Sequence, residues 1–250
     1  MRSNPTAVTW DALAESYESA RVRPDSLDAL LEFPAQLSLI GDVTGKRVLD
    51  LGCGSGAKAI YLARQGAREV VGVDISEAQA ESLARRELPP GTRFLRGDMS
   101  HLDQIDGLSG PFDVVLLLNA LSFVEDELVT LRGIRGRVED DGVLVLARAH
   151  PFRFAVERSE ATGAMLGAAY HDRSPFSYPS TWNANVTVTH RTATFGDTVN
   201  RLADAGFWIE RMLEPTLSEE QRRRFPHKAA WLDCHVGTLI IRARPRHKTS

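Results

Sequence analysis

Short apolar runs alternate with helical patterns along the chain from residue 46 to residue 150. The run "FDVVLLLNA" (112–120) is apolar almost throughout, which is typical of a strand that is covered on both faces. Strands that alternate with helices of this length are joined by right-handed crossovers, so they lie parallel in one sheet. The alternation therefore predicts an α/β fold with a doubly wound, Rossmann-like, mostly parallel sheet and helices on both faces.

The elements of this half follow from periodicity and from residues that start or stop helices. Ser76 is a candidate N-cap, and Pro89-Pro90 should stop the helix that Ser76 begins. The predicted strands are 47–51, 69–75, 92–98, 112–120 and 142–150, and the predicted helices are 57–66, 76–88 and the segment "DELVTLRGIRGRV".

Two regions interrupt the alternation. Residues 1–45 are predicted to be helical, because Trp10, Leu13 and Tyr17 share one helix face. Residues 151–192 contain prolines, aromatic residues and a period-2 stretch that predicts an extra strand at 182–190. Both regions have the size of lids over a cleft.

A C-terminal part, 193–250, completes the predicted fold. It contains a helix at 196–206, a strand at 208–214, a polar loop and a last strand at 236–244. We therefore expect a single domain with about seven strands, the last one antiparallel. Its four parts are an N-terminal cover (1–45), a cofactor-binding half (46–150), a lid insertion after the fifth strand (151–192) and the C-terminal part (193–250).

Composition limits the class of protein. The chain has 250 residues, enough for one domain with a sizeable core. The net charge of -3 offers no electrostatic argument for a nucleic-acid partner. Two cysteines cannot build a disulfide framework or a four-cysteine zinc site. With no signal-like or membrane-spanning apolar run, we expect a cytoplasmic protein without a membrane partner, as a monomer or homodimer.

The stretch "VLDLGCGSG" (48–56) is the first candidate binding loop. It follows a predicted strand, and ligands of open α/β sheets lie beyond the carboxyl ends of strands. Gly52, Gly54 and Ala57 satisfy a dinucleotide fingerprint, with Asp74 about 20 residues further on. However, Asp50 would repel a pyrophosphate, whereas it can accept a hydrogen bond from an ammonium group. The loop therefore favours a ligand with a cationic amino-acid end.

Four motifs in fixed order extend this interpretation: "VLDLGCGSG", "VVGVDIS", "FLRGDM" and "FDVVLLLNAL". Over roughly residues 45–150, the chain resembles the class I S-adenosylmethionine-dependent methyltransferases. The resemblance implies S-adenosyl-L-methionine as cofactor and S-adenosyl-L-homocysteine as product. The combination of the four motifs is far more specific than the glycine loop alone.

The resemblance also implies roles for individual residues. Asp50 would lie near the amino end of the cofactor, and Asp74 would bind both ribose hydroxyls. Asp98 would accept from the adenine amino group, and the backbone at Met99 would contact the ring edge. Asn119 would pass close to the transferable methyl group. The implied cofactor-binding residues are Asp50, Gly52, Cys53, Gly54, Gly56, Asp74, Ile75, Asp98, Met99 and Asn119.

Structural alternatives remain open for three of these residues. Asp50 could instead cap the following helix or anchor the loop. Asp98 could be only an Asx-turn residue. Cys53 is expected mainly as a small buried side chain, since no partner suggests a redox or nucleophilic role.

Methyl transfer requires an aligned acceptor, exclusion of water and sometimes removal of a proton. His150 ends a predicted strand and is the candidate general base, with a structural histidine that shapes the loop as the alternative. Many members of the family carry a histidine after the fourth strand, where this chain has Ser122 and Phe123. Tyr17 would cover the cofactor, as aromatic residues do in related enzymes, unless it only packs in the core.

The segment 168–182 is dense in aromatic residues. Tyr170, His171, Tyr178 and Trp182 could line an acceptor pocket, or they could pack a lid. We predict no metal site, because Asp140-Asp141 precede a strand and so lie at the wrong edge of the sheet.

The predicted function is transfer of a methyl group from S-adenosylmethionine to an O, N or C atom of a small-molecule acceptor in natural-product or secondary metabolism. An RNA or protein methyltransferase is the first alternative, although "NALS" replaces the "NPPY" motif of base amino-group methylases. A nicotinamide-dependent oxidoreductase is opposed by Asp50. An enzyme that binds the cofactor but catalyses another reaction stays open.

Overall fold

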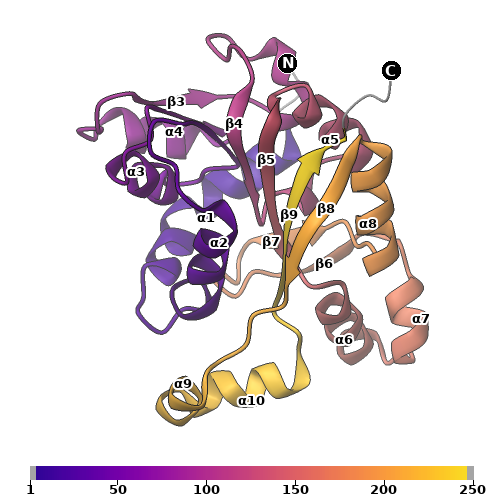
Figure 1. Ribbon diagram of the computed structural model, residues 1–250. Helices are drawn as coiled ribbons and strands as arrows, with labels where there is room; N and C mark the ends of the chain where they lie inside the picture. The colour runs from indigo at the N-terminus through magenta and orange to yellow at the C-terminus, as the bar shows by residue number, and fades with distance from the viewer. Residues whose placement is uncertain (1–3, 247–250) are drawn as a thin grey trace.

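The computed structural model describes residues 4–246, and it contains a central seven-stranded sheet (Figure 1). The strand order is β3-β2-β1-β4-β5-β9-β8. Strands β1 to β5 are parallel, and β9 runs antiparallel to both of its neighbours. The strands are β1 (Arg47–Leu51), β2 (Glu69–Asp74), β3 (Thr92–Arg96), β4 (Phe112–Leu118), β5 (Val138–Ala149), β8 (Phe207–Leu213) and β9 (Thr238–Pro245). The predicted α/β fold with an antiparallel last strand is confirmed.

Helices cover both faces of this sheet, as two apolar clusters show. Leu131 of α5 and Leu202 of α8 belong to the cluster on one face, and Leu39 of α2 and Leu62 of α3 belong to the cluster on the other. The helices of the sheet layers are α2 (Phe33–Ile40), α3 (Ala57–Arg64), α4 (Glu77–Ala84), α5 (Glu127–Arg135) and α8 (Phe195–Asp204).

Strand β4 is the centre of the core. Val115 and Leu117 belong to the first cluster, and Val114 and Leu116 to the second, so the strand alternates between two apolar layers. This is the two-sided coverage that its continuous apolar sequence predicts. Burial of each such side chain stabilises the fold by about 1.5–3 kcal/mol.

The remaining elements surround the carboxyl ends of the parallel strands. The N-terminal cover contains α1 (Pro5–Arg21) and a one-turn π-helix, η1 (Asp28–Glu32). The insertion contains α6 (Pro151–Thr162), α7 (Leu166–His171) and the hairpin of β6 (Phe176–Pro179) and β7 (Thr187–His190). Short 3-10 turns lie at η2 (Met99–Gln104) and η3 (Leu121–Phe123), and the last helices are α9 (Glu219–Arg224) and α10 (Pro226–Cys234).

Three element predictions need correction. Ser76 does cap α4, but the helix ends at Ala84 rather than at residue 88, because the Arg85 and Arg86 N–H groups donate to carbonyls three residues back, at Ser82 and Leu83, and not four. The strand predicted at 182–190 is only β7, since a turn closed by Ser180 N–H to the Val186 carbonyl occupies the first part. The predicted polar loop after residue 214 contains α9 and α10, and α6, α7 and β6 of the insertion were not predicted.

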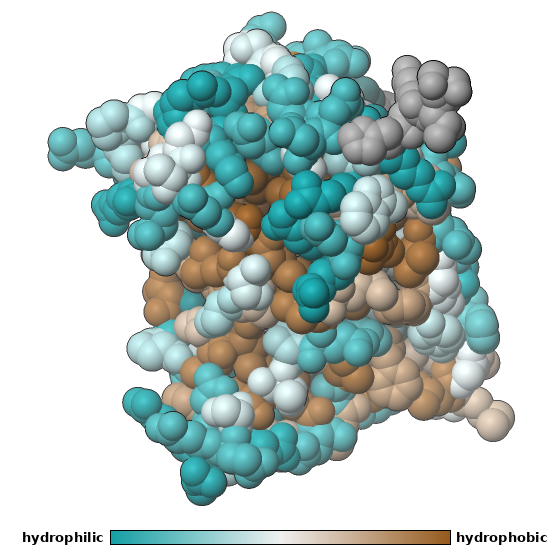
Figure 2. All heavy atoms as spheres, viewed as in Figure 1, coloured by the Kyte–Doolittle hydropathy of each residue, from teal (hydrophilic) through white to brown (hydrophobic). Residues whose placement is uncertain are grey.

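On the face shown in Figure 2, apolar side chains concentrate across the middle of the molecule and hydrophilic side chains surround them. No helix within residues 4–246 is both long and apolar enough to cross a membrane.

Candidate active site

The glycine loop follows β1 in a conformation that excludes side chains. Gly52, Gly54 and Gly56 have φ values of 70°, 53° and 70°, in the left-handed region that L-residues with a Cβ rarely adopt. A Cβ on Gly52 would lie 2.5 Å from the Cβ of Ala120, and one on Gly56 would lie 2.4 Å from the Phe94 ring. A Cβ on Gly54 would meet nothing within 4 Å, so the middle of the loop faces open space.

Asp74, at the end of β2, holds this loop in place. Its carboxylate accepts hydrogen bonds from the Gly54 N–H at 2.7 Å and from the Ser76 N–H at 2.9 Å. Burial raises the pKa of Asp74, although these backbone donors oppose the increase. Asp74 therefore shapes the loop and also lines the cavity in front of it.

Asp50, within β1, is a buried carboxylate without a hydrogen-bond donor among residues 4–246. Burial raises its pKa to about 6, even though the nearby cations Lys58 and Arg21 lower it. A buried carboxylate without donors is costly to the fold. The alternative roles of helix cap or loop anchor require such donors, so the geometry instead suits a donor supplied by a ligand.

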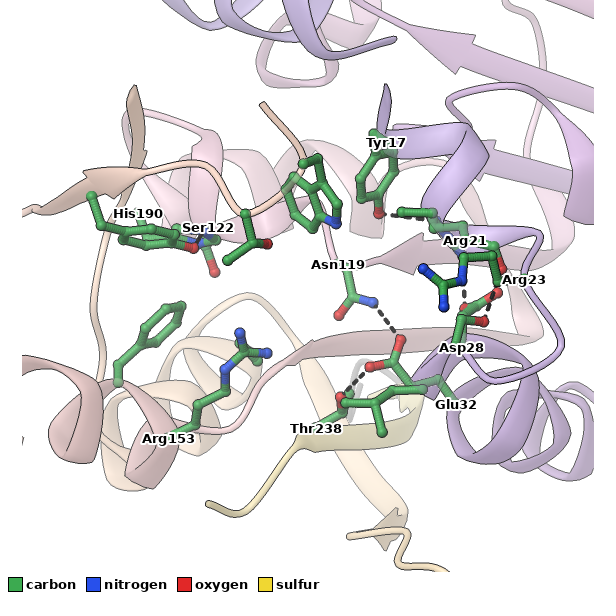
Figure 3. A pocket seen from close by; sticks show the side chains of 18 of the residues that line it. Tyr17, Arg21, Arg23, Asp28, Glu32, Asn119, Ser122, Arg153, His190 and Thr238 are labelled. Carbon is green, nitrogen blue, oxygen red and sulfur yellow. Dashed lines mark hydrogen bonds and ion pairs between the residues drawn. The ribbon is translucent and has the colours of Figure 1, made fainter. Parts of the chain in front are cut away.

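Asn119 follows β4 with a φ of 62°, which makes it the one non-glycine among residues 4–246 with positive φ. Its Nδ2 donates to Glu32 Oε2 at 3.0 Å, and the Thr238 hydroxyl donates to Glu32 Oε1 at 2.5 Å (Figure 3). Glu32 thus fixes Asn119 between two cavities. Backbone strain of this kind is concentrated at functional sites.

Three connected cavities lie along the carboxyl ends of the strands. The loop cavity, about 70 Å³, is lined by Gly52, Gly54 and Asp74 among others. The aromatic cavity, about 350 Å³, lies beyond Asn119 under the insertion. The residues that line both are Trp10, Tyr17, Arg21, Asn119 and Phe123.

The third cavity, about 620 Å³, contains Asp98 and Met99. It joins the loop cavity through a shared lining of Thr6, Ile75, Met99, Ala120 and Phe123. Asp98 accepts from the Ser100 N–H at 2.9 Å, which is the Asx turn considered above, and from Asn4 Nδ2 at 3.2 Å. The turn and a ligand contact are compatible, because a carboxylate has several acceptor positions.

Helix α1 covers both the loop cavity and the aromatic cavity, since its residues line both. Trp10 packs on Tyr17 with ring centroids 5.2 Å apart, and Tyr17 packs on Trp182 of the insertion at 4.6 Å. Asp11 anchors the helix to α4, since it accepts from the Ser76 hydroxyl at 2.6 Å and from the Ala78 N–H at 3.1 Å. The aromatic residue expected as a cover is therefore at the junction of the two cavities.

Arg21 is a site residue that sequence reasoning missed. It lines both cavities, donates to the Tyr17 hydroxyl at 3.0 Å and pairs with Asp28 at 2.7 Å. Lys58 shares Asp28 at 2.8 Å. The available signal was the spacing of Tyr17 and Arg21, four residues apart on the face of α1 that carries Trp10.

The four aromatic candidates of the insertion separate into two pairs. Tyr178 and Trp182 line the aromatic cavity. Tyr170 and His171 do not: the Tyr170 hydroxyl accepts from the Phe195 N–H at 3.0 Å, and His171 is exposed at the end of α7. The difference arises because the helix ends before the hairpin, so the two halves of the segment face different neighbours.

His150 lies outside all three cavities. It is the N-cap of α6, where its Nδ1 accepts from the Phe152 N–H at 3.1 Å and its Nε2 lies 2.8 Å from Glu214 Oε1. Burial lowers the pKa of His150, against the opposing effect of Glu214. Both ring nitrogens are occupied, so the geometry favours the structural alternative over the general base.

His190, at the end of β7, is the histidine that lines the aromatic cavity. Its Nε2 lies 2.8 Å from the Tyr178 hydroxyl, and the rings of Phe123 and Phe154 flank it. Burial lowers the pKa of His190 to about 3, so the ring is neutral near pH 7. Its Nδ1 is buried without a partner among the described residues.

Two further expectations concern Cys53 and metals. Burial, together with the nearby carboxylates Asp50 and Asp74, raises the pKa of the partly buried Cys53 thiol well above the ordinary value and opposes thiolate chemistry. Within residues 4–246, no group of three or more His, Cys, Asp or Glu side chains is arranged to hold a metal ion.

Comparisons with known proteins extend these observations. Residues 48–142 match the family model described as a methyltransferase domain. The chain is 31% identical to an uncharacterized protein of Haemophilus influenzae over 95% of this chain and 96% of that one. It is 27% identical to the ubiquinone biosynthesis O-methyltransferase of Vibrio campbellii over 68% of this chain and 72% of the relative.

Solved structures share the fold. An S-adenosylmethionine dependent methyltransferase from Mesorhizobium loti superposes with a TM-score of 0.66 at 25% identity, over 85% of this chain and 97% of that one. The magnesium protoporphyrin IX methyltransferase of Synechocystis, solved with bound SAH, superposes with a TM-score of 0.62 at 17% identity, over 96% of this chain and 97% of that one.

Proposed function

The chain belongs to the class I S-adenosylmethionine-dependent methyltransferases, and from this premise we propose that it methylates an O, N or C atom of a small-molecule acceptor. The observation that carries the proposal is the aromatic cavity. Its volume of about 350 Å³ suits a small molecule, and it shares five lining residues with the loop cavity. An acceptor there would lie directly beside the cofactor.

S-adenosylmethionine is the cofactor, and it supplies an electrophilic methyl group on a sulfonium. The chemistry of the donor set fits its amino-acid end, since Asp50 lacks a protein donor and Arg21 offers a guanidinium. We propose that Asp50 accepts from the ammonium group, that Arg21 faces the carboxylate and that Asp74 accepts from the ribose hydroxyls. Asp98 and the Met99 backbone, in the third cavity, would take the adenine ring.

The protein's own contribution is alignment and exclusion of water. Asn119, held by Glu32, separates the two cavities at the place where the methyl group would be transferred. Tyr17 and Trp182 cover that place with packed rings. We propose that His190 and Tyr178, rather than His150, are the polar pair that contacts the acceptor, because they line the cavity.

The class of acceptor is supported by two observations. The net charge of -3 offers no attraction to RNA. The similarity to O-methyltransferases of ubiquinone biosynthesis supports an oxygen acceptor here. A natural-product or secondary-metabolite intermediate remains part of the proposal, acted on by a cytoplasmic monomer or homodimer.

Transfer of labelled methyl groups tests the proposal. The protein is incubated with methyl-labelled S-adenosylmethionine and a cell extract separated into low-molecular-weight, RNA and protein fractions. Label should enter the low-molecular-weight fraction and should be lost with Gly52→Ala, whose Cβ would strike Ala120. Label in RNA or protein alone would contradict a small-molecule acceptor.

A further inference from the structure

Arg153, in the first turn of α6, presents an unfilled pair of hydrogen-bond donors to the aromatic cavity. Its Nε donates to Glu157 Oε1 at 2.8 Å, and its guanidinium lies 5.1 Å from the centre of the Trp231 ring. Neither Nη atom has a partner among the described residues. Figure 3 shows the guanidinium end pointing into the cavity.

The acidic side chains that line this cavity already have partners. Asp28 is shared by Arg21 and Lys58, and Glu32 accepts from Asn119 and Thr238. The bidentate pair of Arg23 and Asp25 neutralises itself in the same way. The acidic side chains of the lining are thus already paired, whereas cationic donors of the cavity are without a partner among the described residues.

A guanidinium edge with two free N–H groups matches a planar carboxylate, which binds arginine through two parallel hydrogen bonds. The contacts of Arg153 with Glu157 and Trp231 hold that edge in one orientation. Glu157 compensates part of the charge but leaves both Nη donors free. The geometry therefore provides one preorganised anion-binding position in an otherwise aromatic cavity.

The place of Arg153 defines where the anion would lie. Arg153 lines the aromatic cavity but not the loop cavity, and Asn119 lines both. Aromatic side chains, among them Phe154, Tyr178 and Trp182, line the same cavity as Arg153 and Asn119. A flat apolar body would pack on these rings, with its charged group on Arg153 and its reacting atom near Asn119.

We propose that the acceptor is a small aromatic carboxylic acid and that Arg153 binds its carboxylate. This assignment rests on the proposed function for the identity of the reaction, but the carboxylate site is a property of the cavity alone. Arg153 is a specificity-determining residue: it selects acceptors with a carboxylate and sets which atom reaches the cofactor.

Calorimetric binding to the protein saturated with S-adenosylhomocysteine tests the assignment. Benzoate and cinnamate are compared with the neutral isosteres benzamide and cinnamamide. A charge-assisted bidentate contact should favour each acid over its amide by about tenfold or more. Arg153→Gln should abolish that preference without changing amide binding, and Arg153→Lys should restore part of it.

The matched control is Arg132→Gln, because Arg132 is an exposed arginine on α5 that lines none of the three cavities. It should leave the preference for acids intact. Equal binding of acids and amides, or no binding of either acid, would overturn the assignment. If phenyl phosphate binds more tightly than benzoate and this binding depends on Arg153, the site binds a phosphate and the carboxylate assignment is wrong.

The same samples separate this inference from the proposed function. Binding of S-adenosylhomocysteine, measured before the acids are added, should be the same in the wild-type protein and in Arg153→Gln. Failure of S-adenosylhomocysteine to bind the wild-type protein would contradict the proposed function, whereas the acid-to-amide ratio reports on Arg153 alone.

Discussion

At the scale of single residues, two residues of the site adopt states that cost folding free energy. Asp50 is a buried carboxylate without a donor, and Asn119 holds a left-handed backbone conformation. Asp50 lies within β1 and Asn119 directly follows β4, and these two strands are parallel neighbours in the sheet. Such costs, of order 1–3 kcal/mol for the backbone alone, persist where the surrounding fold over-determines the conformation. Both costs fall at the proposed contact points of the cofactor.

Asp50 leads to a prediction about pH. Burial raises its pKa to about 6 in the free protein, and an ammonium group of the ligand would favour the ionised form and lower it. Binding of S-adenosylhomocysteine should therefore release a proton below pH 6. The dissociation constant, measured by calorimetry, should rise about tenfold per pH unit below 6 and be flat above it.

Asp50→Asn is the variant that isolates this carboxyl, because the pKa of Asp74 is also raised by burial. The variant should bind more weakly at pH 8 and should lose the steep dependence below pH 6. If the slope persists in the variant, another group is responsible and the proposed contact with the ammonium is wrong.

At the scale of elements, the cover α1 is attached to the body of the protein through few polar contacts. Asp11 accepts two hydrogen bonds from the start of α4, at Ser76 and Ala78. Polar contacts also join Asn4 to Asp98, Thr6 to the Phe123 carbonyl and Arg21 to Asp28. In addition, Trp10 packs on Phe123, and Tyr17 packs on Trp182. Because α1 covers both cavities, its docking should be coupled to ligand affinity.

Asp11→Ala tests this coupling. Hydrogen bonds to a charged group contribute about 1.5–3 kcal/mol each. If about half of the loss of one such bond is transmitted to the cavity, binding of S-adenosylhomocysteine should weaken about tenfold, and trypsin should cleave after Arg21 more readily. Glu15→Ala is the matched control, since Glu15 is exposed on the same helix without a partner among the described residues. Equal affinity and equal cleavage rates in the two variants would show that α1 docks independently of Asp11.

At the scale of the whole molecule, a buried ionic cluster joins the two halves of the chain. Glu127 of α5 accepts from both Nη atoms of Arg148 in β5 at 3.1 Å and from Arg201 of α8 at 2.7 Å. Arg148 also donates to Thr198 at 3.2 Å and is only 1% exposed. The cluster attaches α8, the first helix of the C-terminal part, to the cofactor-binding half, and none of its residues lines the three cavities.

Glu127→Ala should therefore destabilise the protein without changing the residues that line the cavities. Removal of one partner leaves Arg148 buried and uncompensated, which costs about 3–5 kcal/mol. The free energy of unfolding from urea titration should fall by that amount, while the folded variant still binds S-adenosylhomocysteine. Asp106→Ala, at an exposed position, should change it by less than about 0.5 kcal/mol. A loss below about 1 kcal/mol for Glu127→Ala would indicate that water compensates Arg148.

The amino-acid sequence by itself determined the fold class, the family and the position of the glycine loop. These features rest on local patterns: alternating apolar runs, the caps of helices and glycines that precede a helix. Parallel topology then brings Asp50, Asp74, Asp98 and Asn119 to one edge of the sheet, because each follows or ends a parallel strand. No long-range packing had to be known to expect them there.

Only the tertiary structure determined the residues of the proposed acceptor side. Arg21, Glu32, Arg153 and His190 come from α1, η1, α6 and β7, and these lie outside the repeating strand–helix units. No topological rule predicts where such segments lie. Packing alone therefore decides that His190 lines the cavity, whereas His150 caps a helix. The break of the predicted strand at 182–190 likewise turned Trp182 toward Tyr17. Local sequence patterns thus identify the methyl donor, whereas the aromatic cavity, the proposed acceptor site, forms only when distant segments of the chain pack together.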